Sequence, residues 1–153
     1  MVSITPFLWF DNNLEEALEF YGRVFADAVV HDVQRGGPDG PVFTATFSLA
    51  GQKLMGLNGG PAYEFTEAVS LFVSCEGQAE VDHYWHALTA DGGEEGRCGW
   101  LKDRFGLSWQ IVPTALGQLL GDPDQARAGR AMQAMLQMSK LDIQALTDAA
   151  HNG

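Results

Sequence analysis

The order of strand-like and helix-like segments repeats once along this chain, and that repeat constrains the fold more than any other feature. In the first half, a strand and a helix precede three further strands, at residues 4–10, 14–26, 28–34, 42–49 and 52–58. In the second half, a strand and a helix precede two short strands, at residues 68–75, 78–90 and within 93–113. The repeated order predicts two modules of similar architecture, the second one strand shorter than the first.

Helical periodicity supports both predicted helices. Residues 11–13 are Asp, Asn and Asn, which suit an N-cap, and Glu15 and Glu16 fall in the first turn, where the helix dipole favours acids. The apolar stripe of this helix is Leu14, Ala17, Leu18, Tyr21, Val24 and Phe25. The stripe of the second helix is Val81, Tyr84, Trp85 and Leu88. Each helix is therefore expected to cover one face of a sheet.

Alternating side chains distinguish the two faces of the strands. In 42–49 the residues Phe43, Ala45, Phe47 and Leu49 share one face, and the Ala-Gly pair at 50–51 predicts a hairpin to 52–58. The segment 93–113 contains two strands joined by a tight turn at 103–106. In its last strand Leu107, Trp109 and Ile111 should face the core, and Ser108, Gln110 and Val112 should face the opposite side of the sheet.

The final part of the chain, residues 114–153, changes to helical character. Thr114 suits the start of a short helix ending near Gly121, and Asp122 with Pro123 suits the start of a longer helix reaching about residue 138. Ser139 with Asp142 reads as a capping box for a last helix. A segment of this length buries little surface alone, so we expect it to pack on the preceding domain or on a partner chain.

Composition narrows the classes of partner. The 153 residues suit one domain, and 46% hydrophobic with 19% charged residues is a globular composition. A net charge of −11 repels nucleic-acid phosphates and anionic lipid headgroups, so neither nucleic acid nor a membrane is an expected partner. No apolar run approaches the ~20 residues of a membrane span. We expect no secretory signal peptide, because residues 1–13 lack a basic region and a long apolar run. We expect a cytoplasmic protein whose Cys75 and Cys98 are reduced.

Five segments carry a resemblance to a known family. They are Ile4–Phe10, Ala17–Tyr21, Leu54–Gly60, Gly99–Asp103 and Gly106–Pro113, with the Met-rich residues 132–136 in addition. Together they resemble the vicinal oxygen chelate superfamily, which includes glyoxalase, bleomycin-resistance and dihydroxybiphenyl dioxygenase proteins. Within it the chain looks closest to the PhnB-like group, which often carries the name 3-demethylubiquinone-9 3-methyltransferase.

The resemblance implies an α+β fold. Two βαβββ-like modules, about residues 1–60 and 67–113, would form a curved mixed sheet around a cavity and together make one domain, 1–113. Residues 114–153 would be a C-terminal helical extension. Modules of this superfamily commonly close a barrel with a second module, sometimes from a partner chain, so the resemblance also implies a homodimer.

Metal enzymes of that superfamily place one ligand on each of four strands. Carried onto this chain, these positions fall near Thr5, on Met55 or Gly56, on Val69 or Ser70, and on Gln110. None of them is His, Asp or Glu, whereas a divalent ion prefers imidazole, thiolate or carboxylate ligands. We therefore expect no metal ion and no cofactor.

Parity along the strands and the resemblance together predict the residues of a ligand cavity. Aromatic walls with a few polar groups are typical of small-molecule pockets. The predicted ligand-binding residues are Thr5, Phe7, Trp9, Asn58, Ser70, Trp100 and Gln110. For Phe7 and Trp9 the alternative is core packing or a dimer contact, and for Gln110 it is a solvated sheet face.

No catalytic residue can be identified from the sequence. His83 and His86 form an H-x-x-H pattern, but both lie off the apolar stripe of their helix and should point to water. Cys98 would act as a nucleophile only beside a base or cation that lowers its pKa. Cys75 is most simply a small buried apolar residue.

The leading functional hypothesis is a metal-free protein that binds a small molecule in a sheet-lined cavity. One alternative is a metal-dependent lyase, isomerase or dioxygenase-type enzyme of the same superfamily, and another is a structural dimer module. The methyltransferase in the group's name would need a glycine-rich turn from a strand into a helix. The glycine-rich residues 58–61 are followed by no predicted helix, so the name is not explained by these residues.

Overall fold

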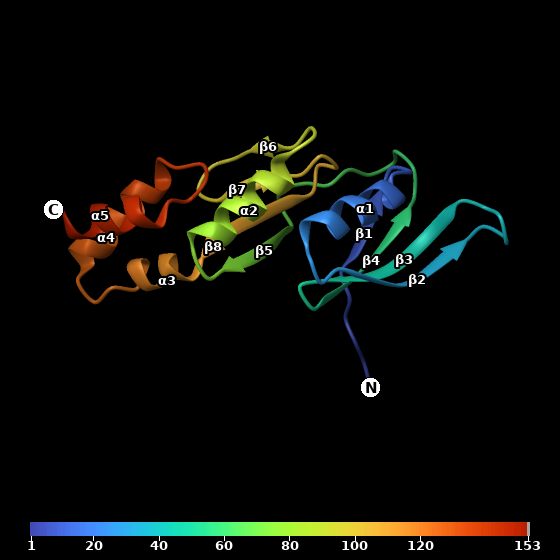
Figure 1. Ribbon diagram of the computed structural model, residues 1–153, viewed down its shortest axis with the longest axis horizontal. Coiled ribbons are helices and arrows are strands. Elements are labelled where there is room, and N and C mark those ends of the chain that lie inside the picture. The colour runs from blue at the N-terminus through green and yellow to red at the C-terminus, as the bar shows by residue number, and fades with distance from the viewer. Residues whose placement is uncertain (153) are drawn as a thin grey trace. The chain divides into compact units, whose positions relative to one another are not determined.

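The structure, a computed structural model, describes residues 1–152 and divides into two compact units. The first unit ends at Phe65 and the second begins at Thr66 (Figure 1). Each unit contains one of the two predicted modules, and the C-terminal helices belong to the second unit. The α+β class predicted from the sequence is confirmed.

The first unit forms a four-stranded mixed sheet covered on one face by a helix. Its elements are β1 (Phe7–Phe10), α1 (Leu14–Val24), β2 (Val29–Arg35), β3 (Val42–Leu49) and β4 (Gln52–Asn58). The strand order is β1-β4-β3-β2, with β1 parallel to β4 and the other pairs antiparallel. Helix α1 contacts β3 and β4, and its buried apolar residues share a core with Phe10, Phe47 and other buried residues of the sheet, because the stripe of α1 and the inner face of the strands are both apolar.

The second unit repeats this order. Its elements are β5 (Ser70–Cys75), α2 (Gln78–Thr89), β6 (Glu94–Glu95), β7 (Trp100–Lys102) and β8 (Ser108–Pro113). The strand order is β5-β8-β7-β6. As in the first unit, the first and last strands in chain order, β5 and β8, are parallel, and the other pairs are antiparallel. The prediction that this module is one strand short was therefore wrong. The missing strand is β6, whose two residues are too few to show any periodicity.

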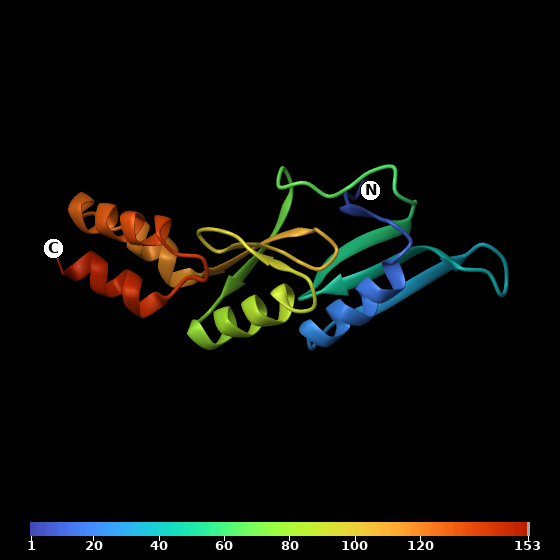
Figure 2. The same ribbon diagram turned by 90° about the horizontal axis from the view of Figure 1, so that it is seen from above.

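Helix α2 runs along one face of the second sheet (Figure 2). Its residues Val81, Trp85 and Leu88 are fully buried. The strand residues Leu101, Trp109 and Ile111 are at most 2% exposed. The predicted alternation of β8 is thus confirmed for its core face. Ser108, predicted on the opposite side of the sheet, is also fully buried.

Two local predictions in the first unit need correction. Phe43 is 56% exposed, because a register shift between Gln34 and Arg35 pairs Arg35 with Val42 and turns Val42 inward instead. The start of α1 is not capped by a neighbouring side chain; the backbone N–H of Leu14 donates to Oδ1 of Asn58 at 2.9 Å. A residue of β4 therefore holds the first turn of α1 against the sheet.

The C-terminal residues form α3 (Thr114–Leu120), α4 (Gln125–Leu136) and α5 (Ile143–His151). The predicted start of α4 was wrong by two residues: its N-cap is Asp124, whose carboxylate accepts from the N–H groups of Ala126 and Arg127. Asp142 is the N-cap of α5 and accepts from Ala145, so it does not occupy the later position of a capping box. Both carboxylates satisfy backbone donors that have no partner inside the helix.

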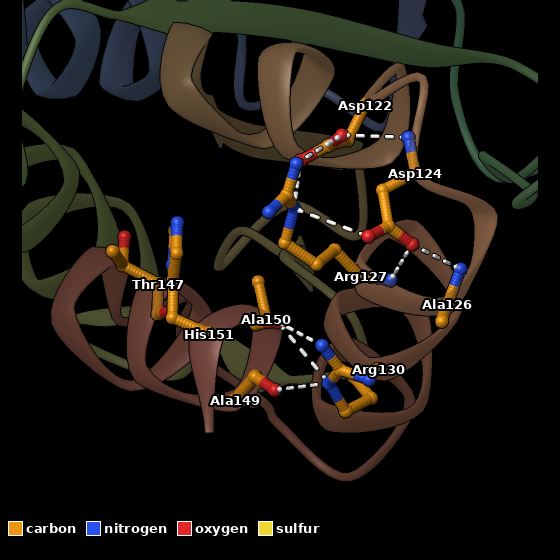
Figure 3. A network of polar contacts seen from close by, with 9 residues as sticks. All are labelled: Asp122, Asp124, Ala126, Arg127, Arg130, Thr147, Ala149, Ala150 and His151. Atoms are coloured by element: carbon orange, nitrogen blue, oxygen red, sulfur yellow. Dashed lines mark hydrogen bonds and ion pairs between the residues drawn. The ribbon is translucent and has the colours of Figure 1, made fainter. Parts of the chain in front are cut away.

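Polar contacts join these helices to one another (Figure 3). The guanidinium of Arg130 on α4 donates to the carbonyl oxygens of Ala149 and Ala150 at the end of α5. This places a cation at the negative end of a helix dipole. Arg127 pairs with Asp122 at 3.0 Å. The hydrogen bond from the Asp124 N–H, followed by the hydrogen bond and the charge of Arg127, lowers the pKa of Asp122.

The C-terminal helices pack on the second unit of their own chain. Leu116, Leu141 and Leu146 form a small core with partly buried residues such as Val112 and Met135. Two backbone hydrogen bonds, Cys98 N–H to Met138 O at 2.8 Å and Gly99 N–H to Ser139 O at 2.9 Å, tie the segment before α5 to the loop before β7. Within residues 1–152, no helix combines the length and the apolar character that crossing a bilayer requires.

Candidate functional site

The candidate site lies on the face of the second sheet that α2 does not cover. Gln110 on β8 pairs with Phe72 of the parallel strand β5 and with Trp100 of the antiparallel strand β7. Residues paired across strands point to the same face of a sheet, so the Gln110 side chain stands between two aromatic side chains. Phe72 is 59% exposed, and Gln110 and Trp100 are partly buried.

A hydrogen bond orients Gln110 on this face. Its side-chain Nε2 donates to Oγ of Ser70 at 3.0 Å. A glutamine amide offers two N–H donors and one carbonyl acceptor. The bond to Ser70 uses one donor, and within residues 1–152 the second donor and the carbonyl oxygen have no protein partner. The structure therefore brings together three of the predicted site residues, Ser70, Trp100 and Gln110, and leaves Gln110 with one donor and one acceptor to spare.

Gln110 lines a hollow of about 440 Å³, which we call the Gln110 hollow. The sheet contributes Phe72, Trp100, Gln110 and Val112. The opposite side is formed by the C-terminal helices, through Leu116, Gly117 and Leu120 of α3 and Met135 of α4. The volume falls within the range of small-molecule sites, and a mainly apolar lining with few polar groups is typical of them.

Cys98 and Thr114 add polar atoms to the lining of the Gln110 hollow. Cys98 is partly buried and lies in the loop before β7, with a backbone φ of 58°. The other cysteine, Cys75, is fully buried, and this burial, with the nearby charge of Glu80, raises its pKa to about 11. Neither cysteine is in a disulfide. Of the two, only Cys98 has access to the hollow.

A second hollow, of about 550 Å³, lies on the other side of Trp100. Its lining includes an ion pair between Lys102 and Glu67, and the hydrogen bond within this pair raises the pKa of Lys102. Ser108 borders it with a buried Oγ that makes no hydrogen bond to the protein. This hollow is richer in charge than the Gln110 hollow.

The remaining predicted site residues belong to the first unit. Trp9 donates its indole N–H to the carbonyl oxygen of Gly60 at 2.9 Å, and its ring meets Tyr63 edge-on at 4.9 Å. Trp9 thereby holds the segment that follows β4. Phe7 is 50% exposed on the face of β1 opposite α1, and Thr5 precedes that strand.

Asn58, also predicted as a ligand-binding residue, lies on the helix-covered side of its sheet. Besides accepting from Leu14, it donates to Oε1 of Glu15 at 3.2 Å and to the carbonyl oxygen of Val42 at 2.9 Å. Three hydrogen bonds to its own unit occupy the side chain. We therefore leave Asn58 out of the candidate site.

Sequence reasoning missed several residues of the Gln110 hollow. Phe72 shares the parity of Ser70 along β5, a signal that could have found it. Gly117, Leu120 and Met135 gave no such signal, because the sequence does not say which wall a C-terminal helix packs against. His83 and His86 are exposed, as predicted. In the described part of the chain, no three His, Cys, Asp or Glu side chains are grouped so as to hold a metal ion.

Comparison with known proteins assigns the family. A model of the 3-demethylubiquinone-9 3-methyltransferase family matches residues 2–112, well over half of the chain. This chain belongs to that family. The match ends before α3, so it does not include the Met-rich residues 132–136 in which the sequence also suggested a resemblance. A search of curated proteins finds no match.

One solved structure supports the assignment to the 3-demethylubiquinone-9 3-methyltransferase family, and a second one shares the fold. A Bacillus cereus PhnB protein named for that family is 33% identical, with a TM-score of 0.66, and its whole chain matches 74% of this one. A Pseudomonas aeruginosa protein is 22% identical, with a TM-score of 0.61, and the match covers 98% of its chain and 74% of this one.

More distant structures show which fold this family has. A fosfomycin resistance protein of Listeria monocytogenes, solved with Mn(II) and sulfate, has a TM-score of 0.54 at 17% identity. The match covers 89% of that chain and 71% of this one. This chain thus shares the fold of that fosfomycin resistance protein, with the two βαβββ modules that the resemblance implied.

Proposed function

We propose that this protein binds a small, mainly apolar molecule in the Gln110 hollow without the help of a metal ion. The observation that carries the proposal is the placement of Gln110. Its amide has one donor and one acceptor to spare and stands between Phe72 and Trp100 in a hollow of about 440 Å³. A ligand with one carbonyl or hydroxyl group could exchange hydrogen bonds with this amide while its apolar part contacts the aromatic rings.

The donor set of the site argues against a metal. The fold family implies metal ligands on four strands, and the Listeria relative is named as a complex with Mn(II). On this chain the two such positions in the second unit are Val69 or Ser70, and Gln110. Val69 offers no ligand atom, and Ser70 and Gln110 offer a neutral hydroxyl and a neutral amide that are hydrogen-bonded to each other. Neither supplies the charge or the imidazole nitrogen that a divalent ion prefers. We derive no catalytic step through a metal.

The methyltransferase in the family's name finds no support in the geometry. Nucleotide-like cofactors commonly bind where a glycine-rich turn leads from a strand into a helix of a parallel sheet. The glycine-rich residues 58–61 lead into β5 with no intervening helix, and the turn from β1 into α1 contains no glycine. Ligand binding is therefore the function we propose.

Calorimetry or thermal shift with small aromatic and dicarbonyl compounds tests the proposal. We expect at least one compound to bind the wild type and to lose affinity by about tenfold or more in Gln110→Ala, the cost of one or two buried hydrogen bonds. Gln133→Ala, at an exposed position of α4 outside the hollow, should bind like the wild type. Binding that is equally strong in both variants would contradict the proposed site.

Elemental analysis separates this proposal from the metal-dependent alternative. Protein purified without a polyhistidine tag should contain far less than one equivalent of Mn, Fe, Ni or Zn. A stoichiometric metal that survives dialysis, and whose removal abolishes binding, would favour a metal-dependent lyase, isomerase or dioxygenase-type enzyme instead.

We also propose that the chain forms a homodimer in the cytoplasm. Support comes from large apolar side chains that are exposed in the single chain, among them Phe7, Phe43 and Val69 at 50 to 66%. Burying such side chains against a second copy would remove apolar area from water and stabilise a dimer. Two unpaired cysteines suit a reducing compartment. Size-exclusion chromatography with light scattering should give about twice 16.6 kDa, and a monomer at micromolar concentration would contradict the dimer.

A further inference from the structure

We infer that the C-terminal extension, residues 114–152, determines which ligands the Gln110 hollow accepts, and that Gly117 is the position that leaves room for them. This inference rests on the proposed function and adds the part of the chain that selects the ligand. The family model ends at residue 112, and the whole Bacillus cereus chain is matched by 74% of this one. The extension is therefore a feature that this protein adds to the shared fold.

The extension supplies one whole side of the hollow. Thr114, Leu116, Gly117 and Leu120 of α3 and Met135 of α4 face the sheet residues across it. Helix α3 begins directly after β8, so no flexible linker separates this side from Gln110. Without the extension, the face that carries Phe72 and Trp100 would be open to solvent on this side.

The side of the hollow that the extension forms, which we call the wall, is fixed in place and can therefore select ligands by their shape. Leu116 is packed with Leu141 and Leu146, which are both fully buried. The residues that follow α4 are fixed to the loop before β7 by the backbone bonds of Cys98 and Gly99. Gln78 of α2 adds two more bonds, to the carbonyl oxygen of Leu141 at 3.0 Å and from the N–H of Ile143 at 2.8 Å. A wall fixed from several sides is preformed, which lowers the cost of binding.

Gly117 stands out in this wall. A glycine inside a helix lowers its stability relative to alanine. No structural need explains it here: its φ is not positive, and a Cβ at this position would meet no atom within 4 Å. Gly117 is exposed and lines the hollow, so the missing side chain leaves open space at the solvent-facing edge of the hollow. We assign that space to the apolar part of a ligand whose polar group binds Gln110.

The test fills the space without disturbing the core. Gly117→Ala should raise the melting temperature and keep binding, whereas Gly117→Leu and Gly117→Phe should weaken binding of the compounds found above by about tenfold or more through steric overlap. Gly129→Leu is the matched control, because Gly129 lies in α4, also has no atom within 4 Å of a Cβ, and does not line the hollow. Its binding should equal that of the wild type.

A second measurement needs no ligand. Cys98 opens into the same hollow, so a side chain at position 117 should slow its reaction with a small maleimide several-fold, while Gly129→Leu should not. An unchanged labelling rate of Cys98 in Gly117→Phe would overturn the role of the extension and leave the proposed function standing. The same conclusion would follow if Gly117→Phe bound the compounds as tightly as the wild type while Gln110→Ala failed to bind them. If no compound binds the wild type, both the proposed function and this inference fall.

Discussion

The side chain of Gln110 donates a 3.0 Å hydrogen bond to Oγ of Ser70, a residue 40 positions earlier in the chain. The two residues lie on β8 and β5, the parallel pair of the second sheet. The bond fixes the rotation of the Gln110 amide, so that its carbonyl oxygen and second N–H keep a defined direction before any ligand arrives. Preorganisation of this kind is what a binding site needs from residues next to the one that contacts the ligand.

A double-mutant cycle should measure this bond. Gln110→Ala and Ser70→Ala are each expected to lower the free energy of unfolding by about 1 kcal/mol, since the bond is neutral and partly buried. The double variant should cost less than the sum, with a coupling of about 0.5–1.5 kcal/mol, measured by urea denaturation. Simple additivity would show that the two side chains do not interact in solution.

Asp103 should be the most sensitive polar residue of the second unit. It is 2% exposed; its Oδ1 accepts from the N–H groups of Phe105 and Leu107, and its Oδ2 accepts from Nε1 of Trp109 at 2.9 Å. Removing the carboxylate removes three hydrogen bonds, two of which are buried. We expect Asp103→Ala to lower the free energy of unfolding by about 3 kcal/mol or more.

A graded series separates these contributions. Trp109→Phe removes one donor and leaves the turn intact, so it should cost less than Asp103→Ala. Asp39→Ala, at an exposed position of the loop before β3, should change the free energy of unfolding by less than about 0.5 kcal/mol. If Asp103→Ala were as mild as Asp39→Ala, the carboxylate would not organise the turn between β7 and β8.

Local patterns predicted the features of the fold that depend on local interactions. The bounds of β3 and β4, the stripe of α2 and the core face of β8 all follow from alternation or helical spacing. The cap of α1 could not be predicted this way, because Asn58 is 44 residues away from the N–H that it accepts. The exposure of Phe43 results from a register shift with a neighbouring strand, which no pattern within β3 reveals.

The same distinction applies to the candidate site. Ser70 and Gln110 were predicted from strand parity and family resemblance, and the structure joins them. The wall formed by Gly117 and Met135 depends on where α3 and α4 dock. That docking is decided by a few leucines and by backbone bonds between distant segments, so it is not encoded in any local spacing.

Removing the hydroxyl group of Ser108 should stabilise the folded protein. The residue is fully buried, and its Oγ has no hydrogen-bond partner in the protein. A buried hydroxyl without a partner costs free energy, so Ser108→Ala should raise the free energy of unfolding by about 1 kcal/mol, measured by urea denaturation. Ser74→Ala, at an exposed position of β5, should have little effect. A clear loss in Ser108→Ala would mean that its hydroxyl is satisfied, for example by an ordered water.

The two cysteines should differ sharply in reactivity. Burial raises the pKa of Cys75 to about 11, so at pH 8 its thiol is both inaccessible and protonated. Cys98 is partly buried and borders the Gln110 hollow. We expect a thiol reagent to modify one cysteine per native chain and two in denaturant, with Cys98→Ala abolishing the native reaction. Two equivalents in the native protein would mean that Cys75 is not enclosed.

The raised pKa of Cys75 also predicts how stability changes at alkaline pH. In the unfolded chain its thiol ionises near pH 9, whereas the folded protein keeps the proton up to a pKa of about 11. Between these values the folded state binds the proton and the unfolded state has lost it, so the free energy of unfolding falls as pH rises. Urea denaturation at pH 8 and at pH 10.5 should show this fall in the free energy of unfolding. The fall should be smaller in Cys75→Ala than in Cys98→Ala. An equal fall in both variants would show that other groups cause the alkaline loss.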